Sequence, residues 1–138
     1  ALVAQAGLGE QVIRAGWVAQ EELPNYFAAA DVAIYPMDDS LLNRCKCPAK
    51  LVDLLGAGVP VVGSDVGQVR ESLRHGESGL LVPSGDVSAM AEAVVRLLSD
   101  ADDRASLSAG ARRLVGEDLA WPLLAARLEQ GYGRLVRG

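Results

Sequence analysis

The first two thirds of the chain alternate between short runs rich in β-branched residues and longer segments whose apolar residues recur with helical spacing. The short runs predict four strands, at residues 12–18, 32–35, 60–63 and 80–82. Continuous apolar runs of this kind are typical of strands that are covered on both faces. Strands that alternate with helices indicate a parallel sheet in an α/β layer fold.

Helical periodicity covers most of the other residues. It predicts helices at 20–30, 48–56, 66–74, 86–99, 102–115 and 121–136, after a helix end within residues 1–9. The last three follow one another without a strand and form a helical tail. In the helix at 86–99 the residues predicted to face inward are Met90, Val94, Leu97 and Leu98. In the last helix, one face is shared by Leu124, Leu128, Tyr132 and Leu135. Residues 37–47 show no period, which predicts a loop.

Residues 48–62 are the stretch around which the pattern is organised. Pro48 suits the first position of a helix, because it has no N–H to leave unpaired. The glycines at 56 and 58 favour a helix end there, and Pro60 prevents continuation into the strand that follows. The only two lysines of the chain, Lys46 and Lys50, lie at the helix start. A helix N-terminus with added cations is a candidate anion site.

In open parallel sheets, ligands bind outside the carboxyl ends of the strands. The predicted strands end at residues 16–17, 36–39, 63–64 and 83–84, and the helix at 48–56 starts at the same edge. We therefore expect the polar candidate residues to converge on one rim.

Composition excludes several classes of partner. The 138 residues are one domain's worth of chain and half of them are hydrophobic, so a packed core is expected and disorder is not. A net charge of −5 provides no basic field for nucleic acid. No segment reaches the ~18 apolar residues of a membrane span.

The two cysteines and one histidine do not predict a metal site. Cys45 and Cys47 are one residue apart, so in an extended segment they point to opposite faces and would strain to form a disulfide. A zinc site needs about four ligands. We predict reduced thiols, a turn with His75 exposed, and no bound metal. Asp38 and Asp39 either form a hydrated loop or help to place a metal or an acceptor.

Two longer motifs carry a resemblance to a known family. Residues 58–67 read Gly-Val-Pro-Val-Val-Gly-Ser-Asp-Val-Gly, and residues 76–86 read Gly-Glu-Ser-Gly-Leu-Leu-Val-Pro-Ser-Gly-Asp. Together they resemble the C-terminal, donor-binding half of the retaining glycosyltransferases of family 4, which have the two-domain GT-B fold. Trp121 and Tyr132 are similar to an aromatic pair in the family's final helix. The resemblance implies a Rossmann-like domain that binds a nucleotide-diphosphate sugar and transfers the sugar with retention of configuration.

The family's two glutamates, eight positions apart, fall on Cys45 and Asp53 in this chain. The resemblance implies that Asp53 accepts hydrogen bonds from the ribose hydroxyls, against the alternative of a solvated carboxylate. Cys45 takes the first-glutamate position beside the donor sugar, where a thiol cannot replace a carboxylate. The chain is more similar to a branch that reads Pro-x-Lys-Leu-x-Glu, which makes Lys50 a candidate diphosphate ligand and catalytic group, or else a surface lysine.

Backbone groups and the rim complete the implied donor site. Ala49 and Leu51 offer N–H groups to the diphosphate, which does not depend on their side chains. Gly16 and Trp17 lie where the family meets the nucleobase, although Trp17 could equally pack in the core. The resemblance requires no metal and no other cofactor.

The resemblance also implies that residues 1–138 are an incomplete domain. The family's domain begins with two strands and a helix, including an arginine and a lysine for the diphosphate, and follows an N-terminal acceptor domain. We expect the partner piece to be the protein's own N-terminal domain or a swapped copy of the chain, and the fragment alone to be inactive. The full-length enzyme is expected in the cytoplasm, at the inner face of the membrane where its acceptor requires it.

Two alternatives remain open at this point. A degenerate glycosyltransferase domain kept for binding or assembly is consistent with the thiol at Cys45. A phosphoacceptor receiver domain, another doubly wound sheet, would use Asp38, Asp39 and Lys50, with Asp65 as a poorly fitting acceptor.

Overall fold

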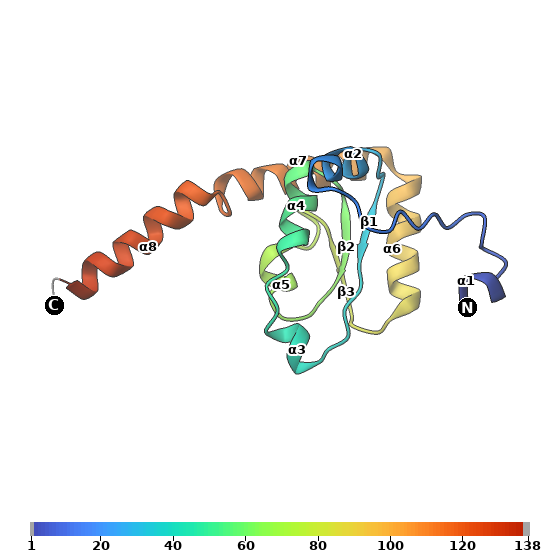
Figure 1. The fold of residues 1–138 in the computed structure, drawn as a ribbon, viewed down its shortest axis with the longest axis horizontal. Helices are drawn as coiled ribbons and strands as arrows, with labels where there is room; N and C mark the ends of the chain where they lie inside the picture. The colour runs from blue at the N-terminus through green and yellow to red at the C-terminus, as the bar shows by residue number, and fades with distance from the viewer. Residues whose placement is uncertain (1, 137–138) are drawn as a thin grey trace.

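A three-stranded parallel sheet forms the centre of the molecule (Figure 1). The computed structural model describes residues 2–136. The strands are β1 (Ala33–Tyr35), β2 (Val61–Ser64) and β3 (Leu80–Val82), in the order β1-β2-β3. Ala33 lies opposite Val61, and Val62 opposite Leu80. The predicted α/β fold with a parallel sheet is confirmed.

Helices cover both faces of this sheet and extend beyond it. A 3-10 turn occupies Gln20–Glu22, and the helices are α1 (Leu2–Gln5), α2 (Leu23–Ala28), α3 (Leu41–Arg44), α4 (Ala49–Ala57), α5 (Val69–Ser72), α6 (Val87–Ser99), α7 (Ala101–Glu117) and α8 (Trp121–Val136). Figure 1 shows α4 and α5 on one side of the sheet and α6 on the other. The Asp86 carboxylate accepts the Ala89 N–H at 2.9 Å and starts α6, as the sequence predicts.

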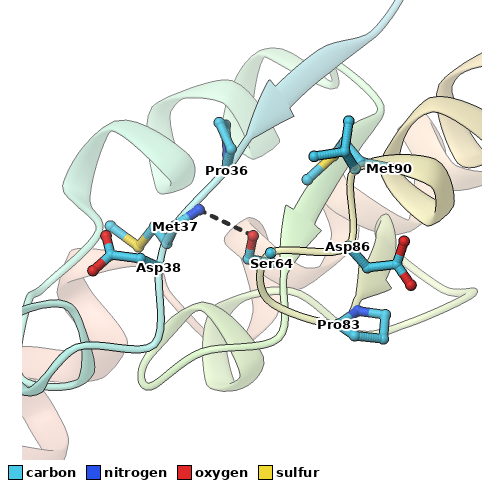
Figure 2. A pocket seen from close by; sticks show the side chains of 9 residues that line it. Pro36, Met37, Asp38, Ser64, Pro83, Asp86 and Met90 are labelled. Carbon is cyan, nitrogen blue, oxygen red and sulfur yellow. Dashed lines mark hydrogen bonds between the residues drawn. The ribbon is translucent and has the colours of Figure 1, made fainter.

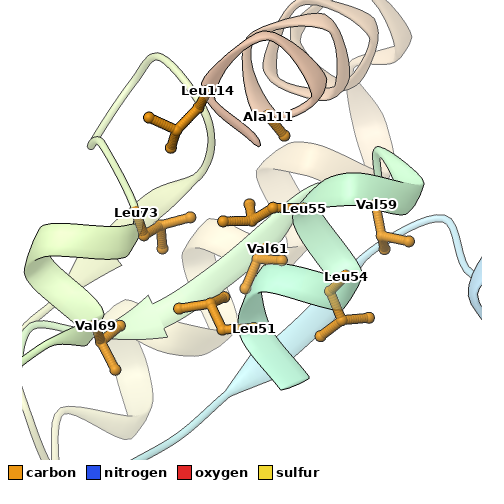
Figure 3. Packing of buried hydrophobic residues seen from close by; sticks show 9 residues of the cluster. All are labelled: Leu51, Leu54, Leu55, Val59, Val61, Val69, Leu73, Ala111 and Leu114. Carbon is orange, nitrogen blue, oxygen red and sulfur yellow. The ribbon is translucent and has the colours of Figure 1, made fainter. Parts of the chain in front are cut away.

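The two adjacent valines of β2 divide the core into two clusters. Val61 packs with α4, α5 and α7 in the cluster that Figure 3 shows, whose buried members are Leu51, Leu54, Leu55, Val59, Val61, Val69, Leu73, Ala111 and Leu114. Val62 points to the opposite face and packs with Leu97 of α6. Successive side chains of a strand point to opposite faces of the sheet, so two adjacent valines place one side chain in the core on each face. Burial of each such side chain contributes roughly 1.5–3 kcal/mol.

Helix α4 ends as its glycines predict. Gly58 adopts the left-handed conformation with φ 77°, and its N–H donates to the carbonyls of Leu54 and Leu55. The Arg112 guanidinium of α7 donates to the Ala57 carbonyl at 3.1 Å. This cation satisfies one of the last carbonyls of α4 and ties α4 to α7.

The prediction of a strand at residues 12–18 is wrong. These residues are not in a strand and pair with none in the described part of the chain, and Ile13 is 91% exposed. A strand exists only through hydrogen bonds to a neighbour, and β1 at the edge of the sheet is paired only with β2. The sequence indicates a β-branched run but cannot supply its partner.

Residues 37–47 are more ordered than the predicted loop. Ser40 begins the short helix α3 by accepting the Asn43 N–H on its Oγ at 3.4 Å. The Asn43 side chain in turn donates to the carboxylate of Asp38 at 2.6 Å. The N-cap serine was the available signal for this helix. Conversely, the helix predicted at 66–74 shortens to the single turn α5.

The last helix has its predicted bounds, but its apolar face is not packed. Leu128, Tyr132 and Leu135 are 60%, 62% and 79% exposed, and Leu98 of α6 is also exposed rather than inward. Figure 1 shows α8 extending away from the sheet. Periodicity indicates which face of a helix is apolar and not what that face contacts. Within residues 2–136, no helix is long and apolar enough to span a bilayer.

Candidate functional site

A surface pocket of about 540 Å³ lies between the segment before α2 and the first half of α4. We call it the α2–α4 pocket; its lining residues are Gly16, Trp17, Val18, Gln20, Leu23, Tyr26, Lys50 and Asp53. Four residues that the sequence analysis selected, Gly16, Trp17, Lys50 and Asp53, therefore line one hollow. They come from segments more than thirty residues apart in the chain.

Helix α4 places the two charged members of this pocket. Leu51, Leu54 and Leu55 are buried in the core, so the opposite face of the helix is turned to solvent and carries Lys50 and Asp53. The two side chains are separated by three positions, about one helical turn, and therefore share this face. One ammonium and one carboxylate on a rigid helix can bind the anionic part and the hydroxyl part of the same ligand.

Aromatic rings border the same pocket. Trp17 is 99% exposed and Tyr26 of α2 is 50% exposed, while Val18 between them in sequence is half-buried. The alternative in which Trp17 packs in the core is therefore wrong for this structure. A free indole face is a surface on which a planar base can stack.

Backbone groups at the start of α4 are less available than the sequence suggests. The Ala49 N–H donates to the Cys47 carbonyl at 3.0 Å, and the Leu51 N–H to the Pro48 carbonyl at 2.9 Å. A phosphate bound there would have to share or replace these two bonds. The Leu51 side chain is fully buried and takes no part in the pocket.

Cys45 stands apart from the α2–α4 pocket. It is the C-cap residue of α3, it is exposed, and it is absent from the pocket lining. Cys45 and Cys47 are both free thiols. Among residues 2–136, no three His, Cys, Asp or Glu side chains gather in a way that could hold a metal ion.

A second hollow, of about 360 Å³, forms where the three strands end (Figure 2). Its walls are mostly apolar, with Pro36, Met37, Pro83 and Met90, and its rim carries Asp38 and Asp86. The expected convergence on one rim is thus only partly correct. The ends of β1, β2 and β3 meet here, whereas Gly16, Trp17, Lys50 and Asp53 line the separate α2–α4 pocket.

Two serines that the sequence analysis did not select hold this second hollow together. The Met37 N–H donates to the Oγ of buried Ser64 at 3.0 Å, and the Ser84 hydroxyl donates to the Met37 carbonyl at 2.8 Å. The chain leaving β1 is therefore joined to the ends of β2 and β3 by side-chain hydrogen bonds. A serine at the end of a buried strand was the only local signal for this role.

His75 has a partner that the sequence did not predict. Although the residue is exposed, its Nδ1 accepts the Leu81 N–H at 2.9 Å. Leu81 belongs to β3, an edge strand. The imidazole thus accepts a backbone N–H that would otherwise be unpaired at the edge of the sheet.

Two of the three aspartates considered as metal or phosphoryl sites, Asp39 and Asp65, are held by arginines. Arg44 makes two hydrogen bonds to Asp39, at 2.6 and 2.8 Å, and Arg70 pairs in the same two-point manner with Asp65. The hydrogen bond from Arg44 holds the pKa of Asp39 below its usual value of 3.8, and Arg70 adds to the effect. A carboxyl whose folded-state pKa is depressed stabilises the fold above the unfolded pKa and loses that contribution as pH falls through the folded value.

Comparison with known proteins now decides the family. The family described as glycosyl transferases group 1 matches residues 1–100. The chain belongs to this family. Membership confirms the resemblance drawn from residues 58–67 and 76–86, and it excludes the alternative of a receiver domain.

Individual relatives agree with this assignment. The chain is 33% identical over 131 residues to D-inositol 3-phosphate glycosyltransferase from Thermobispora bispora, covering 95% of this chain and 29% of that protein. It is 32% identical over 137 residues to GDP-mannose-dependent alpha-(1-6)-phosphatidylinositol monomannoside mannosyltransferase from Mycobacterium tuberculosis, covering 92% of this chain and 34% of that protein. The chain therefore spans about a third of the length of these relatives.

A solved structure shows the same fold. HepE from Anabaena, in complex with UDP and glucose, superposes with a TM-score of 0.81 and 19% sequence identity. The match covers 96% of this chain and 34% of HepE. The chain therefore has the Rossmann-like fold found within GT-B glycosyltransferases.

Proposed function

We propose that this chain is the donor-binding part of a glycosyltransferase and that it binds a nucleotide-diphosphate sugar in the α2–α4 pocket. The base stacks on Trp17 beside Gly16, the ribose hydroxyls donate to Asp53, and the diphosphate contacts Lys50. The observation that carries the proposal is that all four residues line one pocket. The complex of HepE with UDP and glucose supports a nucleotide ligand for this fold.

In the proposed reaction the bond between the sugar anomeric carbon and the diphosphate breaks as the acceptor oxygen bonds to that carbon, with retention of configuration. The proton of the acceptor hydroxyl passes to the departing diphosphate oxygen. The protein stabilises the charge that develops on the departing diphosphate. Lys50 supplies a cation at this point, and the start of α4 supplies a favourable dipole. Neither contribution requires a metal ion.

We propose further that residues 1–138 form only part of the enzyme and are inactive alone. A helix terminus contributes about 0.3–1 kcal/mol at an exposed site and up to ~2 kcal/mol when partly buried. Enzymes lower their barriers by about 8–23 kcal/mol. The rest of this lowering of the barrier has to come from polypeptide outside this chain, namely the acceptor domain with further cations, or a swapped copy. Sugar transfer by the purified 138-residue chain would contradict this proposal.

The names of relatives support a proposal for the acceptor and the place of action. One relative is named for a phosphatidylinositol monomannoside acceptor, which is a lipid. We propose that the full-length protein acts in the cytoplasm and, with a lipid-linked acceptor, at the inner face of the membrane. Its nucleotide is UDP or GDP, since HepE binds UDP and the mannosyltransferase depends on GDP-mannose.

The test is calorimetric titration of the full-length protein with UDP and with GDP. We expect micromolar binding of one nucleotide, and we expect Asp53→Ala to raise its Kd about 10- to 100-fold, because hydrogen bonds to a charged group contribute about 1.5–3 kcal/mol. The matched control is Glu92→Ala, which removes an exposed carboxylate from α6 on the other side of the sheet. It should leave Kd unchanged.

The outcomes separate the two functional hypotheses. If Asp53→Ala binds as tightly as the wild type, the ribose does not contact Asp53 and the proposed site is wrong. If the wild type binds neither UDP nor GDP, a degenerate, non-catalytic domain is favoured. The thiol of Cys45 at the position of the family's first glutamate is consistent with that alternative.

A further inference from the structure

The segment that connects β1 to α4 rests directly on the turn between β2 and α5. Gly67 in that turn has a φ of +48°, and a Cβ atom on it would lie 2.6 Å from both the Cα and the carbonyl oxygen of Arg44. No side chain fits at this contact. The backbone at the end of α3, immediately before Cys45, is therefore seated on the backbone of the β2–α5 turn.

A cluster of alternating charges accompanies this contact. Asp39 and Arg44 come from the β1–α4 segment, Asp65 and Arg70 come from the β2–α5 segment, and all four line one hollow with Gly67. Each arginine pairs with the aspartate of its own segment through two hydrogen bonds. Arg70 and Asp39 line the same hollow from different segments, and the charge of Arg70 helps to lower the pKa of that carboxyl.

The β1–α4 segment is braced by hydrogen bonds between its own residues. The Asn43 side chain donates to the carbonyl and the carboxylate of Asp38, and Ser40 caps α3. At its beginning, Met37 is held by Ser64 and Ser84. The contact of Arg44 with Gly67 fixes the other end, just before Cys45 and the first turn of α4 with Lys50.

We propose that Gly67 and Arg70 are positioning residues, which hold the β1–α4 segment so that the start of α4, with Lys50, faces the diphosphate of the donor. The inference rests on the proposed function. Neither residue lines the α2–α4 pocket, so both act through the segment and not by touching the nucleotide. Exposed ion pairs contribute little to stability, so a purely structural role for Arg70 would leave almost no measurable effect on activity.

The experiment compares two pairs of matched variants in the full-length protein. Gly67→Ala adds a methyl group that must displace Arg44, whereas Gly76→Ala adds one at a similar positive φ of +77° with nothing within 4 Å. Arg70→Gln removes an arginine–aspartate pair at the segment, whereas Arg96→Gln removes the Arg96–Asp103 pair between α6 and α7, in which the arginine is 61% exposed against 66% for Arg70. Each variant is titrated with UDP and GDP and assayed for transfer from UDP-glucose and GDP-mannose.

We expect Gly67→Ala to lower kcat on the order of 100-fold, because displacement of a site by about 1 Å can have an effect of that size. Arg70→Gln should lower kcat about tenfold, with Arg70→Lys intermediate because it keeps the charge but not the two-point geometry. The Kd for the nucleoside diphosphate should stay within about threefold of wild type, since Trp17 and Asp53, which are proposed to bind the base and the ribose, lie outside the β1–α4 segment. Gly76→Ala and Arg96→Gln should behave as the wild type.

Three results would overturn the proposal. Equal kcat values for Arg70→Gln and Arg96→Gln would show that the cluster positions nothing, and this variant remains informative if Gly67→Ala does not fold. A parallel loss of kcat, nucleotide affinity and melting temperature would indicate a structural role only. Failure of the wild type to bind UDP or GDP would instead overturn the proposed function, and the positioning role with it.

Discussion

Replacement of Lys50 by alanine is expected to lower kcat of the full-length enzyme about 100- to 1000-fold, the usual effect of removing one preorganised group that stabilises transition-state charge. Lys50 lies in the first turn of α4 and lines the α2–α4 pocket with Asp53. Its ammonium has most effect when the diphosphate gains charge on leaving, so kcat should fall more than nucleotide affinity. Steady-state assays with UDP-glucose or GDP-mannose measure kcat, and titration with UDP or GDP measures the nucleotide affinity.

The chain offers a close control in its only other lysine. Lys46 is exposed and lies four positions earlier, but it is absent from the lining of the pocket. Lys46→Ala makes the same change in net charge and should leave kcat within about twofold of wild type, because exposed charges at a distance are screened. If both variants lose kcat to a similar extent, the effect comes from the overall positive charge of this region and not from contact between Lys50 and the diphosphate.

Gly110→Ala is expected to destabilise the protein by about 3 kcal/mol, the upper end of the range for an overpacked core. Gly110 is buried in α7, and a Cβ atom on it would overlap the carbonyl oxygen of Glu77 in the turn before β3. That turn cannot retreat freely, because the buried Ser78 accepts the Arg74 N–H and Gly79 packs on Leu73. Thermal denaturation should show a melting temperature lower by about 10 °C.

Gly116→Ala is the matched control for this substitution. It lies in the same helix α7, and a Cβ atom there would meet nothing within 4 Å. Alanine is preferred to glycine inside a helix by about 1 kcal/mol, so this variant should be as stable as the wild type or more so. If Gly110→Ala melts at the wild-type temperature, α7 does not pack against the Glu77 turn as the structure has it.

Local signals in the sequence predicted the elements that depend on their own residues. The α4–β2 unit is an example: the leucine face and Gly58 each act within one turn of the helix and behave as predicted. Pro48 differs by one position, since it is the N-cap residue and Ala49 is the first helical residue. The N-cap Asp86 predicted the start of α6 for the same reason. Ser40 is an equally local signal for α3, since it marks a helix start inside residues 37–47, where a loop was predicted.

The predicted site depended on longer-range information. The family resemblance selected Gly16, Trp17, Lys50 and Asp53, and the structure places all four around one pocket. It does not bring Cys45 to that pocket, and it engages the Ala49 and Leu51 amides elsewhere. Ser64, Ser84 and Gly67 were not selected, since the residues they contact lie in other segments of the chain. Arg70 was not selected either, although its partner Asp65 is only five positions away.

The sequence by itself indicated the family, through the resemblance of residues 58–67 and 76–86 to known motifs. It also determined most of the alternation of strands and helices and the buried and exposed faces of α4, because these follow from short spacings. Only the tertiary structure decided that residues 12–18 lack a pairing strand within the described chain, that the apolar face of α8 is open, and that Trp17 is free to stack. Strand pairing, helix docking and side-chain exposure require a partner that is distant in sequence. A local pattern can show that a residue is suited to such a contact, but only the folded chain shows whether the contact is made.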